Sequence, residues 1–98
     1  MTLEAFKQSL TGTTPPAELI GALTGLWWDA KGNWGRAHES AQEDSSSAGS
    51  WVHAYLHRKE GDDSNAAYWY GRAHQPVCRE AFESEWLNIV RTLLARSG

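Results

Sequence analysis

Residues 51–76 read WVHAYLHRKEGDDSNAAYWYGRAHQP and predict two helices joined by a tight turn. Gly61 marks the turn, because glycine takes the left-handed conformation that closes a helix at little steric cost. Arg58 and Lys59 precede it, where cations suit the negative end of a helix dipole. Asp62 and the two residues after it are good N-cap types for a second helix. A connection this short predicts that the two helices are antiparallel neighbours.

The spacing of small and aromatic residues predicts how these two helices pack. The first helix is expected over about 48–60 and the second over about 64–74. Ala66 and Tyr70 are four apart and therefore share one face of the second helix. Ala66 lies near the turn, where a small side chain lets the backbones approach, and Tyr70 fills the wider gap further along.

The rest of the chain also has helical patterns. We expect helices over 2–10, from Pro15 to about 31, over 34–42 and over 77–96. Gly21 and Gly25 fall inside the second of these, where each costs up to ~1 kcal/mol against alanine, so we expect close packing there. The last helix is expected to close the open end of the helical stack. The fold prediction is one all-α domain over 1–98, with two antiparallel helical hairpins, a short N-terminal helix and a long C-terminal capping helix.

The composition argues against several classes of function. The chain has 98 residues, of which 41% are hydrophobic, enough for one core. A formal charge of −3 and the lack of a basic stripe argue against nucleic-acid binding. Cys78 is the only cysteine, which excludes an intrachain disulfide and favours a reducing compartment, the cytoplasm. We expect no signal peptide, and no stretch approaches the roughly 20 apolar residues of a membrane span.

The sequence contains an internal repeat. Residues 27–41 align with 56–70 at an offset of 29, which places Gly32 on Gly61, Ala37 on Ala66 and Trp28 on His57. Few residues are identical, but both copies have the same turn chemistry. The repeat predicts two successive hairpins of one kind.

This pattern resembles a tetratricopeptide hairpin. The second copy matches it at its turn glycine, its small packing positions and its closing proline, which are Ala54, Gly61, Ala66, Tyr70, Ala73 and Pro76. The first copy matches at Gly25, Trp28, Gly32 and Ala37. In addition, HAYLHRKEGD followed by AAYWYGRA resembles a family of small bacterial proteins of unknown function. Neither resemblance implies a catalytic activity.

The tetratricopeptide resemblance implies a peptide-binding groove, lined by the first helix of each hairpin. In the second copy the matching positions are Trp51, Tyr55, Arg58 and Lys59, and in the first copy they are Ala22, Leu26, Asp29 and Ala30. Arg58 and Lys59 form a cationic pair where carboxylate-binding members of that family have one. The alternative is that both are the solvated end of a helix.

A second candidate surface lies on the Tyr68-Trp69-Tyr70 helix. Neighbouring residues of a helix diverge by about 100°, so these three side chains cannot all point into the core. Tyr68 or Trp69 is therefore expected at a protein contact or a homodimer interface, with Arg72 near it.

Four residues could form a metal site. His53 and His57 are four apart and project from one face, and His38 or Glu39 of the neighbouring hairpin could supply a third ligand for zinc or another divalent ion. The alternative is that His57 replaces an aromatic residue in the hairpin seam while His53 hydrogen-bonds His38 or Glu39.

The leading functional hypothesis is a small noncatalytic module that binds a protein or peptide and needs no cofactor. No catalytic nucleophile arrangement stands out, because no histidine is fixed beside Cys78 by the sequence. The alternative hypothesis is a metal-binding protein or metal-dependent enzyme centred on the histidines.

Overall fold

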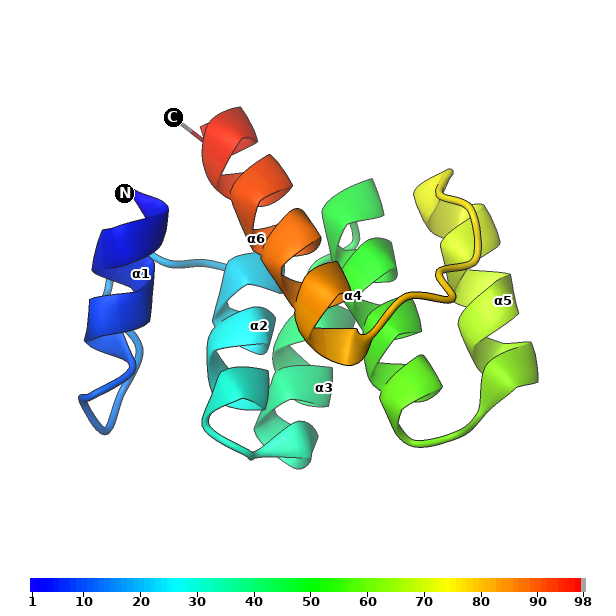
Figure 1. Ribbon diagram of the computed structural model, residues 1–98, viewed down its shortest axis with the longest axis horizontal. Helices are drawn as coiled ribbons and strands as arrows, with labels where there is room; N and C mark the ends of the chain where they lie inside the picture. The colour runs from blue at the N-terminus through cyan, green and yellow to red at the C-terminus, as the bar shows by residue number, and fades with distance from the viewer. Residues whose placement is uncertain (98) are drawn as a thin grey trace.

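The computed structural model describes residues 1–97, over which it contains helices and no strand (Figure 1). The helices are α1 (Leu3–Ser9), α2 (Ala22–Ala30), α3 (Trp34–Glu43), α4 (Ser47–Lys59), α5 (Asp63–Ala73) and α6 (Phe82–Ser97). This confirms the predicted all-α class. Every helix within that range falls short of the length and hydrophobicity that a bilayer span requires.

The turn that joins α2 to α3 and the turn that joins α4 to α5 have the same backbone geometry. Gly32 and Gly61 both have left-handed backbones, with φ of 79° and 86°. After each glycine, Asn33 or Asp62 donates a backbone hydrogen bond of 3.0 Å to the carbonyl five residues before it. The side chains of Asn33 and Asp62 then cap α3 and α5. The turns predicted at Gly61 and at its counterpart Gly32 are confirmed.

Small residues bring the helices together. α2 packs against α3, α4 packs against α5, and α3 lies against α4 (Figure 1). Ala37 and Ala66 are buried at these contacts. A β-carbon on Gly25 would lie 3.1 Å from the carbonyl oxygen of Ala37 and 3.3 Å from a methyl group of Val52. The close packing predicted at Gly25 is therefore confirmed.

The predicted helix from Pro15 is wrong in its first part, because α2 begins only at Ala22. Gly21 has φ of 56° and serves as the N-cap, and a β-carbon there would clash with the carboxylate of Asp44. That carboxylate accepts the N–H of Ala22 at 3.0 Å. Ile20, which lies inside the predicted helix, precedes α2 and is 79% exposed.

The last helix begins later than predicted and lies in a different place. α6 starts at Phe82 rather than Val77, after an irregular segment. It packs against α1, α2 and α4 and crosses in front of α2 and α4 (Figure 1). It therefore lies across α2 and α4, and the prediction that it closes the open end of the stack is wrong. Its apolar stripe faces the other helices, since Ile89, Val90 and Leu93 are buried.

The core lies where α6 meets α1, α2 and α4. The indole Nε1 of Trp27 donates to the Ser9 hydroxyl at 3.0 Å, and the ring of Phe6 meets Trp86 edge-on at 5.7 Å, so that α1 is held by both α2 and α6. The largest fully buried side chains are Trp27, Tyr55, Tyr70, Phe6, Leu26, Leu56, Ile89, Val52 and Val90.

Candidate functional site

The groove predicted from the first helices of the two hairpins defines an inner face, and α6 covers two of the four residues predicted there in the second copy. Trp51 is buried, with Arg96 over its ring at 6.0 Å. Arg58 donates from Nε to Glu85 at 2.9 Å and from its terminal nitrogen to the Glu80 carbonyl at 2.6 Å. Arg58 therefore holds the start of α6 in place and is not a solvated helix end. The other two residues, Tyr55 and Lys59, line an open groove.

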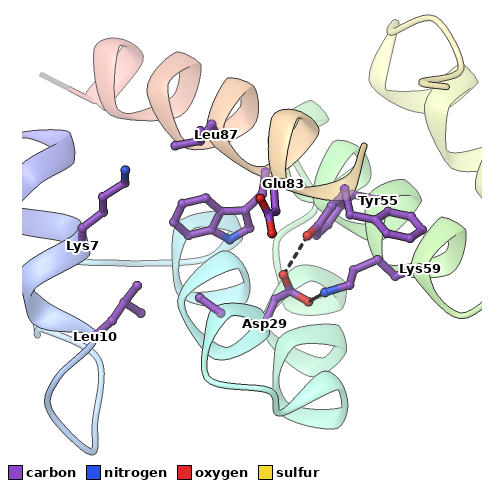
Figure 2. A pocket seen from close by; sticks show the side chains of 10 residues that line it. Lys7, Leu10, Asp29, Tyr55, Lys59, Glu83 and Leu87 are labelled. Carbon is purple, nitrogen blue, oxygen red and sulfur yellow. Dashed lines mark hydrogen bonds and ion pairs between the residues drawn. The ribbon is translucent and has the colours of Figure 1, made fainter. Parts of the chain in front are cut away.

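This groove has a volume of about 570 Å³ and lies between α1, α2, α4 and α6 (Figure 2). α1 contributes Lys7 at one wall, with Leu10 just beyond its last turn, and α6 forms the opposite wall. The full lining is Lys7, Leu10, Asp29, Ala30, Tyr55, Lys59, Phe82, Glu83, Trp86 and Leu87. Four of these, Asp29, Ala30, Tyr55 and Lys59, occupy groove positions predicted from the two hairpin copies.

A buried carboxylate fixes the floor of the groove. Asp29 is 8% exposed and accepts the Tyr55 hydroxyl at 2.9 Å and the Lys59 ammonium at 3.0 Å (Figure 2). Burial, and then the charge of Asp29, raises the pKa of Tyr55 well above its ordinary value, so the hydroxyl remains a donor. The ammonium of Lys59 balances the charge of Asp29, which leaves the floor polar but neutral.

The walls are largely apolar and the rim carries two charges. Trp86 donates its indole N–H to the Leu26 carbonyl at 3.1 Å, which fixes the ring against the end of the groove. Within residues 1–97, neither Lys7 nor Glu83 has a side-chain hydrogen bond or ion pair. Sequence reasoning missed both walls, because they depend on where α1 and α6 dock.

The second predicted surface is only partly free. Tyr68 is 56% exposed, as the divergence of neighbouring side chains predicts, and Tyr70 is buried. Trp69 stacks on His53, with ring centroids 3.9 Å apart. The Arg72 guanidinium lies over the rings of Tyr68 and Trp69, at 5.9 Å and 5.2 Å from their centroids. Trp69 therefore covers a histidine, which leaves Tyr68 and Arg72 as the exposed part of this surface.

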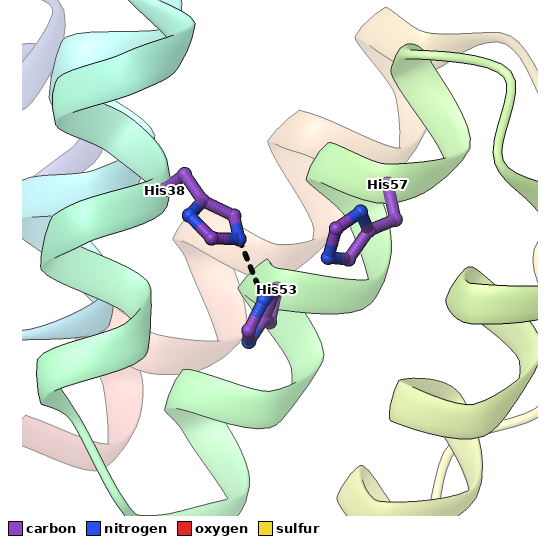
Figure 3. A group of neighbouring side chains, drawn as sticks. All are labelled: His38, His53 and His57. Atoms are coloured by element: carbon purple, nitrogen blue, oxygen red, sulfur yellow. Dashed lines mark hydrogen bonds between the residues drawn. The ribbon is translucent and has the colours of Figure 1, made fainter.

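The three predicted histidines come together between α3 and α4 (Figure 3). Nε2 of His53 lies 2.8 Å from Nε2 of His38, which is the hydrogen bond predicted for His53. His57 joins them, and one ligand nitrogen from each ring lies within 4.8 Å of the other two. Glu39, the fourth predicted ligand, is exposed and outside this cluster.

Neighbouring groups set the protonation of the cluster. Burial, followed by the charges of His38 and His57, lowers the pKa of His53 to about 4. Burial and then His57 also lower the pKa of His38, although Glu60 opposes this shift. Nδ1 of His57 lies 2.6 Å from a carboxylate oxygen of Glu60. Sequence reasoning missed Glu60, although its spacing of three from His57 on a helix is a local signal.

No protein-family model matches the chain, and neither a curated protein nor a solved structure matches it.

Proposed function

We propose that the chain is a small noncatalytic binding module of the bacterial cytoplasm, built from two tetratricopeptide-like helical pairs, that holds a short segment of another protein in the groove. The observation that carries this proposal is that both helical pairs contribute residues to the groove floor. Ala30 and Lys59, both in the lining, are equivalent residues of the two pairs at the 29-residue offset. A floor shared by successive pairs is the arrangement by which stacked helical repeats bind extended peptides.

The repeated turns and the close contacts at small residues support the tetratricopeptide-like assignment. The chain departs from that family in two respects. Its offset of 29 residues is shorter than the family repeat of about 34. In addition, α6 lies over part of the inner face, where it covers Trp51 and engages Arg58. Binding is therefore assigned to the part of that face that α6 leaves open.

The chemistry of the groove favours an apolar side chain flanked by polar backbone. Its volume of about 570 Å³ falls within the range of ordinary ligand sites. Leu10, Trp86 and Leu87 offer half-buried apolar surface along the walls. The neutralised floor and the oppositely charged Lys7 and Glu83 at the rim argue against a strongly charged ligand. The proposed ligand is a short peptide with one bulky apolar residue and no large net charge.

Peptide selection with a blocked variant tests this proposal. A random peptide library is selected on the wild-type protein, and the enriched peptides are measured against Ala30→Trp. Ala30 lines the groove and is exposed, so the indole fills the groove without entering the core. The matched control is Ala67→Trp, at an exposed position on α5.

We expect Ala30→Trp to weaken peptide binding at least about tenfold and the control to leave it unchanged. Failure to enrich any peptide, or equal binding by both variants, would contradict the proposal. Circular dichroism of both variants establishes that the helical fold is retained.

A further inference from the structure

We propose that His38, His53 and His57 form a binding site for one divalent transition-metal ion, with zinc as the first candidate. This site is separate from the groove. His57 is two residues from both Tyr55 and Lys59, and His53 is two residues from Tyr55 and six from Lys59. At about 100° per residue these offsets turn the histidines to the opposite side of α4. The inference goes beyond peptide binding and does not depend on it.

The backbone brings the three imidazoles to one point. His53 and His57 are one helical turn apart on α4, and the contact of α3 with α4 adds His38 (Figure 3). With Zn–N distances of about 2.0–2.1 Å, tetrahedral geometry sets ligand nitrogens roughly 3.3 Å apart. The pair of Nε2 atoms, now 2.8 Å apart, has to open by about half an ångström, and His57 has to move closer.

A carboxylate orients one of the ligands. The contact of Glu60 with Nδ1 of His57, at 2.6 Å, leaves Nε2 of that ring for the ion. Carboxylates hold metal-binding histidines in this way, where they fix the tautomer and raise the basicity of the ligand nitrogen. Glu60 is therefore assigned as a positioning residue.

Stacked rings hold the other two ligands. Trp34 lies parallel to His38 at 4.8 Å between centroids, and Trp69 lies on His53 at 3.9 Å. Trp34 is itself fixed, because its indole N–H donates to the Leu56 carbonyl at 3.0 Å. Rings held before the ion arrives lose little conformational freedom on binding. His38 is half-buried, so the site is reachable from solvent.

The ligand set indicates the class of ion. Three imidazole nitrogens without a thiolate or a carboxylate suit zinc, copper, nickel or cobalt, and they disfavour magnesium and calcium. Three protein ligands leave one tetrahedral position for water. An ion here would link α3 of the first pair to α4 of the second.

Zinc chloride titrated into untagged, chelator-treated protein tests the site by calorimetry. We expect one zinc per chain and a rise in melting temperature on binding. His38→Asn removes a half-buried ligand on α3 and should weaken binding more than about tenfold. Glu60→Gln should weaken it about 10- to 100-fold through the orientation of His57. His74→Asn is the matched control, because His74 is exposed and asparagine tolerates its left-handed backbone.

A measurement on the wild-type protein makes the test independent of how the variants fold. Zinc should shift the imidazole nitrogen resonances of His38, His53 and His57 in a ¹⁵N NMR spectrum and leave those of His74 in place. Absence of stoichiometric binding, binding that His38→Asn leaves unchanged, or shifts confined to His74 would each overturn the proposal.

Discussion

The Tyr70 hydroxyl donates a hydrogen bond to the carboxylate of Glu85, which ties α5 to the first turn of α6. Glu85 is 2% exposed, and its other oxygen accepts Nε of Arg58 at 2.9 Å. Burial, and then the bond to Glu85, raises the pKa of Tyr70 far above its ordinary value, so the hydroxyl stays protonated. One buried carboxylate thus joins α4, α5 and α6 and sets the position of the helix that walls the groove.

Glu85→Gln is expected to lower the free energy of unfolding by about 1–3 kcal/mol, because it removes a buried charge that accepts hydrogen bonds from the buried Tyr70 and the half-buried Arg58. Urea unfolding at pH 7 measures the loss. Glu83→Gln, two residues away in an exposed position, should change stability by less than about 0.5 kcal/mol. Equal stability of the two variants would mean that the Glu85 network does not hold α6.

Ala66→Leu is expected to destabilise the protein by about 1–3 kcal/mol through overpacking, because Ala66 is buried where α5 meets α4. Ala67→Leu adds the same side chain at an exposed position of the same helix and is the control. In thermal unfolding, the melting temperature of Ala66→Leu should be clearly lower than that of Ala67→Leu. An unchanged melting temperature for Ala66→Leu would contradict close contact between these helices.

Asp44 gives a pH-dependent prediction. It accepts backbone N–H groups of Ala22 and Ser46, each at 3.0 Å. Burial alone would raise the pKa of Asp44, but the hydrogen bonds from Ser46 and Ala22 outweigh it and hold this pKa below its ordinary value. The unfolded chain therefore binds a proton more readily. The stability that ionised Asp44 contributes is present above about pH 3.9 and is lost as pH falls through the lower, folded-state pKa.

The measurement compares wild type with Asp44→Asn by urea unfolding from pH 6 down to pH 3. At pH 6 the variant should be less stable by about 1 kcal/mol. The difference between the two proteins should shrink as the pH falls below about 4. A difference that stays constant over this range would show that the charge of Asp44 contributes nothing to stability.

Local signals explain what could be predicted from the sequence. Gly61 and Gly32 close helices through their own backbone freedom, and Asn33 and Asp62 cap the next helix within three residues. The spacing of four between His53 and His57 is equally local. These features depend on few residues outside the turn or helix that contains them, so pattern and propensity were enough to place them.

The errors arose where distant residues decide the outcome. Pro15 suits the first position of a helix by its residue type, but the start of α2 is set by Gly21 and by Asp44, 22 residues beyond Ala22. The position of α6 depends on Glu85 meeting Arg58 and Tyr70, three residues far apart in the sequence. Because both walls of the groove follow from how α1 and α6 dock, the sequence indicated only its floor.

The proposed binding site is the groove between α1, α2, α4 and α6 rather than the Tyr68 surface. Amide chemical shifts of ¹⁵N-labelled protein, followed during titration with a selected peptide, test it most directly. We expect the largest changes at groove residues such as Lys7, Ala30, Lys59 and Leu87. Changes centred on Tyr68 and Arg72, with the groove residues unmoved, would contradict the claim.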